Sequence, residues 1–171
     1  MTADYTKLAS YDIRKVILKE LSQAKLLDLK TYIADGFSSP LEPIIPAQQV
    51  PEFNNLLPGK TYIIYDVMQK GKGVQWWVLE ESMTLEITST STEEVQTIIN
   101  FLVDLFRRYD LSATTINLDL DQTSPFKFLW ARLESADPIQ AFQTEGGFMT
   151  GMLTVHYAYT RETDALTGRY L

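Results

Sequence analysis

The sequence predicts an α+β fold, with a mainly antiparallel sheet of four to five strands and two helices packed on one face. Three observations predict this class. Two long segments repeat apolar residues at helical spacing, several shorter ones alternate apolar and polar residues as strands do, and the strands follow one another with few helices between them. An extended proline-rich arm completes the predicted fold. The 171 residues suit a single domain.

Two segments are predicted to be helical. The first covers residues 10–27 and frays into 28–34, with an apolar stripe opposite charged residues. The second covers residues 92–109 and starts at a capping box formed by Ser91 and Glu94. The two stripes consist of Ile13, Val16, Ile17, Leu21 and Ala24 in the first helix and Val95, Ile98, Ile99, Leu102, Leu105 and Phe106 in the second.

Residues 35–60 form the predicted arm, because they carry five of the seven prolines of the chain. Proline fixes φ and donates no hydrogen bond, which favours an extended connector. The arm also contains Ile44, Ile45 and Phe53, and is too apolar for a solvated linker. Its apolar residues are expected to be covered either by the chain's own domain or by a neighbouring subunit, and the sequence leaves both open.

The predicted core, residues 61–161, begins with a hairpin. Residues 61–67 read as a strand, 69–73 as a turn and 74–88 as a long strand. In the long strand the odd positions are expected to face inward and the even ones, from Glu80 to Thr88, to face water. Glu81 interrupts the inward set and predicts a bulge near 80–82. The inward set is Trp77, Leu79, Met83, Leu85 and Ile87.

Three further strands are predicted over residues 114–120, 126–134 and 148–161, followed by a polar tail over 162–171. The strand 126–134 is apolar on both faces, since Phe126, Phe128 and Trp130 alternate with aliphatic residues. Such a strand lies either in the centre of a two-layer fold or at a subunit interface.

No sequence motif gives a specific indication of catalysis. Gly59-Lys60-Thr61 matches the end of a phosphate-binding loop, but a strand rather than a helix is predicted to follow it. His156 is the only histidine and is expected on the outer side of a strand, and cysteine is absent. Asp119 and Asp121 could hold magnesium but are more typical of a turn. The sequence therefore predicts no catalytic residue, no cofactor and no metal site.

The overall charge bears on the class of partner. A net charge of -7 argues against broad binding to nucleic acid, which needs clustered Lys and Arg. The sequence shows neither a secretory signal at its start nor an apolar run long enough to span a membrane. Aromatic side chains make up 12% of the chain, and core or subunit-contact roles are expected for them.

A set of segments resembles the tail terminator (neck) and tail-completion proteins of tailed bacteriophages. These are "GKTYIIYDV" with Tyr62 and Tyr65, the Glu-rich strand from Glu80 to Ser89, and the helix that ends in Arg107 and Arg108. The turn "DLSA" and the final "GGFMTGMLTVHYAYTR", with Tyr157 and Tyr159, complete a resemblance that covers roughly residues 58–161.

The resemblance implies a hexameric ring without catalytic residues. Such a ring caps the tail tube, stops its elongation and joins it to the head connector, while DNA passes through the lumen without specific binding. It also implies a place in the virion neck, after synthesis in the host bacterial cytoplasm. The candidate contacts with other subunits or partners are Ile44, Ile45, Phe53, Trp76, Phe126, Phe128 and Trp130, and the candidate lumen-facing acids are Glu80, Glu86, Asp119 and Asp121.

A second hypothesis from a different class stays open. The chain could be a small α+β module that binds a ligand or regulates a partner without catalysis. A closed monomer with a ligand in an apolar pocket would favour this hypothesis, whereas rings or binding to tail tubes would favour the first.

Overall fold

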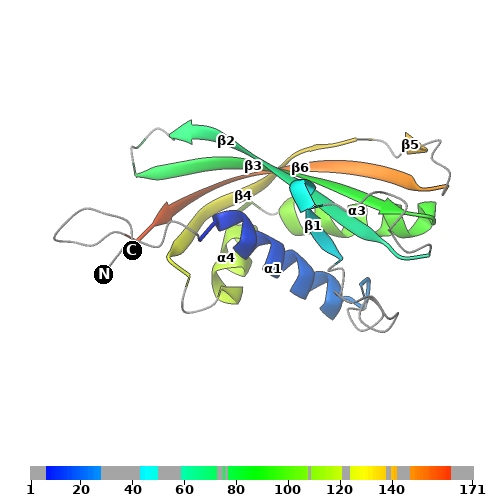
Figure 1. The fold of residues 1–171 in the computed structure, drawn as a ribbon. Coiled ribbons are helices and arrows are strands. Elements are labelled where there is room, and N and C mark those ends of the chain that lie inside the picture. The colour runs from blue at the N-terminus through cyan, green and yellow to red at the C-terminus, as the bar shows by residue number, and fades with distance from the viewer. Residues whose placement is uncertain are drawn as a thin grey trace.

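The computed structural model describes residues 7–27, 43–49, 59–72, 75, 77–107, 109–120, 124–137, 140–141 and 147–162. It confirms the α+β class, with one sheet and the helices gathered on one side of it (Figure 1). The main strands follow the order β1-β2-β3-β6-β4, and the short β5 pairs with β6. Only the β1–β2 pairing among these is parallel. The strands are β1 (Ile44–Pro46), β2 (Tyr62–Lys72), β3 (Val78–Ser89), β4 (Phe126–Ala136), β5 (Gln140–Ala141) and β6 (Met149–Arg161).

The first helix, α1 (Ala9–Gln23), confirms the predicted stripe from Ile13 to Leu21 but ends four residues before the expected position 27, so that Ala24 lies outside it and is exposed. Lys25 adopts a left-handed conformation with a φ of 59°. The amides of Lys25 and Leu26 donate to the carbonyls of Ser22 and Leu21, which is a Schellman motif. The motif satisfies the last carbonyls of the helix without the glycine that usually marks it.

The second predicted helix is confirmed as α3 (Thr92–Arg107). The amide of Glu94 donates to Ser91 Oγ at 3.3 Å, as the capping box predicts. The Glu94 side chain does not reach back to the Ser91 amide, because Ser89 Oγ accepts from that amide at 3.2 Å. Glu94 is therefore available for contacts to β2 and β3.

The predicted strand over 114–120 is wrong, since residues 114–119 belong to a third helix, α4 (Tyr109–Asp119). Ala113 and Ile116 are buried, and they lie three residues apart as one helix face requires. Leu118, which the strand pattern placed beside Ile116, is 79% exposed. Short apolar runs fit both periods, and here the helical one is realised.

The core lies between the sheet and the helices. α3 packs across β3, β6 and β4, and α4 packs on β4 beside α1. The inward residues of β3 and β6 follow the predicted alternation, except that Trp77 is 48% exposed. The prediction that the even positions of β3 face water is wrong for Ser82 and Thr88, which are 6% and 0% exposed. Burying each aliphatic side chain contributes about 1.5–3 kcal/mol to folding. The sheet residues of this core include Ile63, Tyr65, Met83, Leu85, Ile87, Leu153, Val155, Tyr157 and Tyr159.

The described part of the arm, residues 43–49, lies on the chain's own domain. Ile44 and Ile45 are 1% and 5% exposed, and β1 pairs with Ile63–Tyr65 of β2. Arg14 of α1 donates from Nε to the carbonyl of Ile44 at 3.0 Å. The rest of the predicted arm falls outside the described residues, apart from Gly59 and Lys60.

The bulge predicted near Glu81 lies on the partner strand instead. β3 pairs with β6 without interruption from Val78 to Ser89. The register shift occurs in β2, between Gln69 and Gly71. β2 thus continues through the predicted turn to Lys72, and Glu81 stays on the inward face at 7% exposure.

A second bulge explains why both the odd and the even positions of the segment 126–134 are apolar. The pairing of β4 with β6 shifts between Phe128 and Trp130. Phe126 and Phe128 face the core before the shift, and Ala131 faces it afterwards, while Leu129 is left 44% exposed. The apolar residues at odd and at even positions therefore lie mainly on one face of the sheet. The prediction of a central strand is wrong, because β4 ends the main strand order.

The outer edge of β4 is sealed by a side chain of α4. Asn117 donates from Nδ2 to the carbonyl of Phe128 at 2.7 Å and accepts from the amide of Phe128 at 2.9 Å. The Asn117 amide thus makes the two bonds that a neighbouring strand would make. Unpaired strand edges invite association with other chains, and this contact removes one such position.

Replacing Asn117 by Ala is expected to destabilise the fold by about 1–3 kcal/mol, because both backbone groups of Phe128 lose their partner. Urea unfolding followed by circular dichroism measures the difference. Asn100→Ala is the matched control, since exposed Asn100 bonds only Gln96 within α3 and its loss costs about 0.5 kcal/mol or less. Equal effects of the two changes would contradict the edge-sealing role.

Candidate interaction surfaces

The segment Gly59-Lys60-Thr61 starts a strand and does not form a phosphate loop. Gly59 has a φ of 76°, a left-handed turn conformation that glycine adopts without strain. β2 follows at Tyr62, so that no helix begins where a phosphate would have to bind. The structure confirms the expectation that a strand follows this motif.

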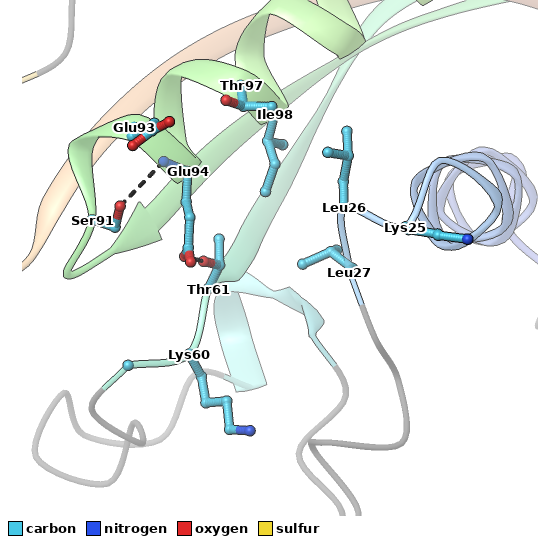
Figure 2. Close-up of a pocket in the computed structure, with 11 residues that line it drawn as sticks. Lys25, Leu26, Leu27, Lys60, Thr61, Ser91, Glu93, Glu94, Thr97 and Ile98 are labelled. Carbon is cyan, nitrogen blue, oxygen red and sulfur yellow. Dashed lines mark hydrogen bonds between the residues drawn. The ribbon is translucent and has the colours of Figure 1, made fainter.

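A pocket of about 580 Å³ lies between the start of α3, the end of α1 and the start of β2 (Figure 2). Leu26, Leu27 and Ile98 form an apolar side, while Lys60 and Glu93 lie on its rim. The lining combines apolar, acidic and basic groups, and neither a histidine nor a metal-binding cluster belongs to it. Its chemistry is suited to holding a small molecule or a side chain, and it supplies no evident pair of nucleophile and base.

The polar groups on one side of this pocket form hydrogen bonds with other groups of the chain. Glu94 Oε2 accepts from Thr61 Oγ1 at 2.6 Å and from Ser89 Oγ at 3.0 Å. The carboxylate joins the first strand of the hairpin, the second strand and the helix that follows. Glu94 therefore has a structural role at the end of the sheet.

A buried carboxylate, that of Glu81, lies on the inward face of the sheet. Glu81 accepts from the hydroxyls of Tyr157 and Tyr159, both at 2.7 Å, with one bond to each oxygen. Burial, together with the nearby Glu81 carboxylate, raises the pKa of the Tyr157 hydroxyl far above its ordinary value of 10.0. Tyr157 is thus held as a proton donor to Glu81.

His156 lies on the opposite, outer face of the sheet and is 7% exposed. Arg132 Nη2 lies 3.4 Å from Nδ1, and Glu80 Oε2 lies 3.3 Å from Nε2. Arginine can only donate, so the contact requires Nδ1 to accept, which places the proton of a neutral ring on Nε2. Trp130 packs edge-on against the ring at 4.8 Å.

Ser82 is the cross-strand neighbour of His156, but the two do not form a catalytic pair in this arrangement. The Ser82 hydroxyl donates to Glu134 Oε2 at 3.0 Å. Both nitrogens of His156 face Arg132 and Glu80, as described above. Activation of a serine requires the base to accept its proton, a geometry that these contacts do not provide.

The four candidate lumen acids do not form one surface. Glu80 and Glu86 lie on the outer face of β3, whereas Asp119 lies at the end of α4 and forms an ion pair with Lys19 of α1. Glu86 is flanked across the sheet by Ile64 and Met152, and burial raises its pKa above the ordinary 4.5. Asp121 falls outside the described residues.

Most of the described aromatic and aliphatic residues predicted as partner contacts belong to the core. Ile44, Ile45, Phe126 and Phe128 are each at most 7% exposed, so the chain's own fold covers them and the prediction is corrected for these four. Trp130 is half-buried against His156, and Arg132 lies 4.9 Å above its ring. Phe53 and Trp76 fall outside the described residues.

Other large apolar side chains are exposed instead, and the sequence did not single them out as contacts. Leu8, Met68 and Leu118 are 50%, 69% and 79% exposed. A pocket of about 230 Å³ lies beside Leu8 and Tyr11, between the start of α1 and the edge formed by β1 and β2. A helix assignment for residues 109–119 would have placed Leu118 opposite the buried Ala113 and Ile116 side and revealed it.

Comparisons with known proteins found no matching family model and no matching curated protein. Across the described residues, no group of three or more acidic or histidine side chains is placed to hold a metal ion. In the same part of the chain, every helix falls short of the length and apolar character that a membrane-spanning segment requires.

Replacing Glu81 by Met is expected to destabilise the fold by about 2–4 kcal/mol, because two buried tyrosine hydroxyls lose their acceptor. The triple variant Glu81→Met, Tyr157→Phe, Tyr159→Phe removes the hydroxyls as well and is expected to recover most of that loss. Denaturant unfolding of the two variants and of wild type measures this cycle. A triple variant as unstable as the single one would show that Glu81 acts other than through the tyrosines.

Replacing Glu86 by Gln is expected to stabilise the fold at neutral pH. Burial raises the pKa of Glu86, so its carboxyl holds the proton more tightly in the folded than in the unfolded state. The stability that it contributes is complete below the unfolded pKa of about 4.3 and is lost as the pH rises through the folded pKa. Thermal unfolding from pH 3.5 to 7.5 should show the advantage of the variant growing with pH, and a constant difference would contradict it.

Proposed function

We propose that this chain is a structural subunit of the neck of a tailed phage, of the tail terminator type. In this role it forms a hexameric ring that caps the tail tube, stops its elongation and joins it to the head connector. Its partners are further copies of itself, the tail tube protein and the head connector or adaptor proteins. The mature ring belongs to the virion and is assembled from chains made in the bacterial cytoplasm.

The observation that supports a structural role is the way in which the described residues use their polar groups. Glu81, Glu94 and Asn117 each connect separate elements of the fold, and His156 lies between Arg132 and Glu80. Meanwhile Leu8, Met68, Trp77, Leu118, Leu129 and Met152 remain substantially exposed. Exposed apolar side chains mark surfaces that bind other proteins where several of them lie together, so these residues are compatible with such a role.

The overall charge is compatible with a ring through which DNA passes. A net charge of -7 opposes lasting attachment to phosphates. Specific acids need not line the lumen for this effect. The sequence-based assignment of Glu80, Glu86 and Asp119 to one lumen surface is not carried forward, because these residues lie on different elements with different partners.

The purified chain is expected to form rings, or to bind the ends of tail tubes and limit their length. Light scattering and negative-stain imaging measure the first outcome. For the second, tail tube protein is polymerised with and without the chain, and the tube lengths are compared. A monomer at all accessible concentrations that neither binds tubes nor shortens them would contradict the proposed function.

One observation favours the alternative of a small ligand-binding module, namely the pocket of about 580 Å³ in Figure 2. Its apolar side and charged rim are suited to a small amphipathic molecule. Thr97 lines the pocket from an exposed position on α3, and the substitution Thr97→Trp would fill part of it. A small molecule that stabilises wild type but not this variant would support the alternative over the ring.

A further inference from the structure

The outer face of the sheet carries a histidine that is almost fully buried. His156 is 7% exposed, although the described helices lie on the other side of the sheet (Figure 1). It is the only histidine of the chain, and an unperturbed imidazole changes its charge near pH 6.5. Side chains of the two strands that flank β6 surround it, so a change in its charge acts directly on them.

Two residues of β4 contact the imidazole. Trp130 packs edge-on against it, with the ring centroids 4.8 Å apart. Arg132 is the cross-strand neighbour of His156, and its Nη2 lies 3.4 Å from Nδ1. The same guanidinium lies over the Trp130 ring, 4.9 Å from its centroid. Arg132 thus connects the indole to the imidazole from an exposed position on the strand.

The acidic groups near His156 come from both flanking strands. Glu80 of β3 places Oε2 3.3 Å from Nε2, and its side chain is 27% exposed. Ser82, the cross-strand neighbour on β3, donates to Glu134 of β4 at 3.0 Å. The adjacent outer-face residues of β6 itself carry no charge. The described charged groups around the ring are therefore one cation, Arg132, and two carboxylates.

The contact with Arg132 requires a neutral imidazole. A guanidinium has only donors, so Nδ1 must offer its lone pair, and the proton of the ring then resides on Nε2. In this state the ring accepts from the guanidinium, and the indole face attracts it. Both contacts hold Arg132 in one position on the outer face.

Protonation of the ring reverses its relation to its charged neighbours. A proton on Nδ1 replaces the acceptor by a donor that faces another donor, and it places two positive charges side by side. The same proton turns the ring into an ion-pair partner for Glu80. Arg132 is exposed and can turn into solvent, where its charge is hydrated. Trp130 then loses the guanidinium that lies over it.

We propose that His156 is a proton-operated switch: the neutral ring holds Arg132 over Trp130, and the charged ring pairs with Glu80 and releases Arg132 into solvent. Acidification thereby uncovers the indole and adds one positive charge to this part of the outer face. The switch goes beyond the proposed neck function and is a property of the isolated chain. It depends on neither a ring nor a tail tube, so either proposal can fail without the other.

The single histidine makes a direct titration of the wild-type chain available. The Cε1 proton of His156 is followed by NMR from pH 8 to pH 5, and it is expected to titrate in one step. The nitrogen shifts at the upper end are expected to report the proton on Nε2. A neutral ring with its proton on Nδ1, or a ring that stays neutral down to acid unfolding, overturns the proposal.

Removing the charged neighbours is expected to shift the midpoint of this titration in opposite directions. Arg132→Met removes the charge that opposes protonation and raises the midpoint by about 0.5–1 pH unit. Glu80→Gln removes the charge that favours protonation and lowers the midpoint by a similar amount. Both side chains are at least partly exposed, so neither change opens a cavity in the core. A midpoint that either substitution leaves unchanged overturns the proposal.

Lys127→Met is the matched control, because it removes the same charge from the same strand. Lys127 pairs with Thr160, four residues along β6 from His156, which corresponds to about 13 Å. At physiological ionic strength the screening length is about 8 Å, so this variant is expected to shift the midpoint by less than about 0.2 pH unit. A shift as large as that of Arg132→Met would show that the ring senses overall charge and not the contact, and would overturn the proposal.

The release of Arg132 is measured through the exposure of Trp130. The chain has three tryptophans, and the changes Trp76→Phe and Trp77→Phe leave Trp130 as the reporter. Acrylamide quenching is expected to increase on acidification with the midpoint of the histidine titration. Arg132→Ala is expected to give the acidic level at every pH, and His156→Asn, which keeps an acceptor but does not titrate, the neutral level. Quenching that does not follow the histidine titration, or that keeps its pH dependence in Arg132→Ala, overturns the proposal even if the His156 variant does not fold.

Discussion

The buried carboxylate of Glu81 is the constraint on which the sheet depends. A carboxylate on an otherwise apolar face requires donors, and Tyr157 and Tyr159 of β6 supply one to each oxygen. A slip of one residue would exchange the two faces of β3 and separate the acid from both hydroxyls. The rings also pack against β4, with Phe126 5.3 Å from Tyr159 and Phe128 5.9 Å from Tyr157. One polar contact thereby fixes the register of β3 on β6 and positions β4 beside them.

The periodic elements of the fold could be predicted, and the irregular ones could not. α1, α3, β3 and β6 follow from long apolar repeats, because each has one face toward the core and one away from it. The bulge predicted in β3 from Glu81 is wrong, because Glu81 stays on the inward face as the acceptor of two tyrosine hydroxyls, and the register shift lies in β2. Likewise, the C-terminal end of α1 at Lys25 lacks the glycine that usually marks such a cap.

The candidate contact surface was missed for a related reason. The sequence predicts Phe126 and Phe128 as contact residues because their strand is apolar on both faces, but a bulge brings residues at odd and even positions to the core. The assignment of residues 114–120 as a strand placed Leu118 inward, whereas the helix places it in solvent. The alternation of Ile116, Leu118 and Leu120 is a pattern of three residues, too short to distinguish the two periods. The position of Ala113 and the bonds of Asn117 to Phe128 distinguish the helix from a strand in this segment.

The two edges of the sheet favour association through side chains over the addition of strands. At β4, Asn117 takes both backbone bonds at Phe128, which a foreign strand would need. At β2, a bulge between Gln69 and Gly71 breaks the regular spacing of the strand. Bulges are among the devices by which natural sheets resist uncontrolled pairing. A strand can add to any compatible edge and so gives little control over the number of subunits, whereas a side chain in a shaped cavity fixes one rotation between neighbours. The proposed role, in which growth stops at a fixed copy number, requires the second kind of contact.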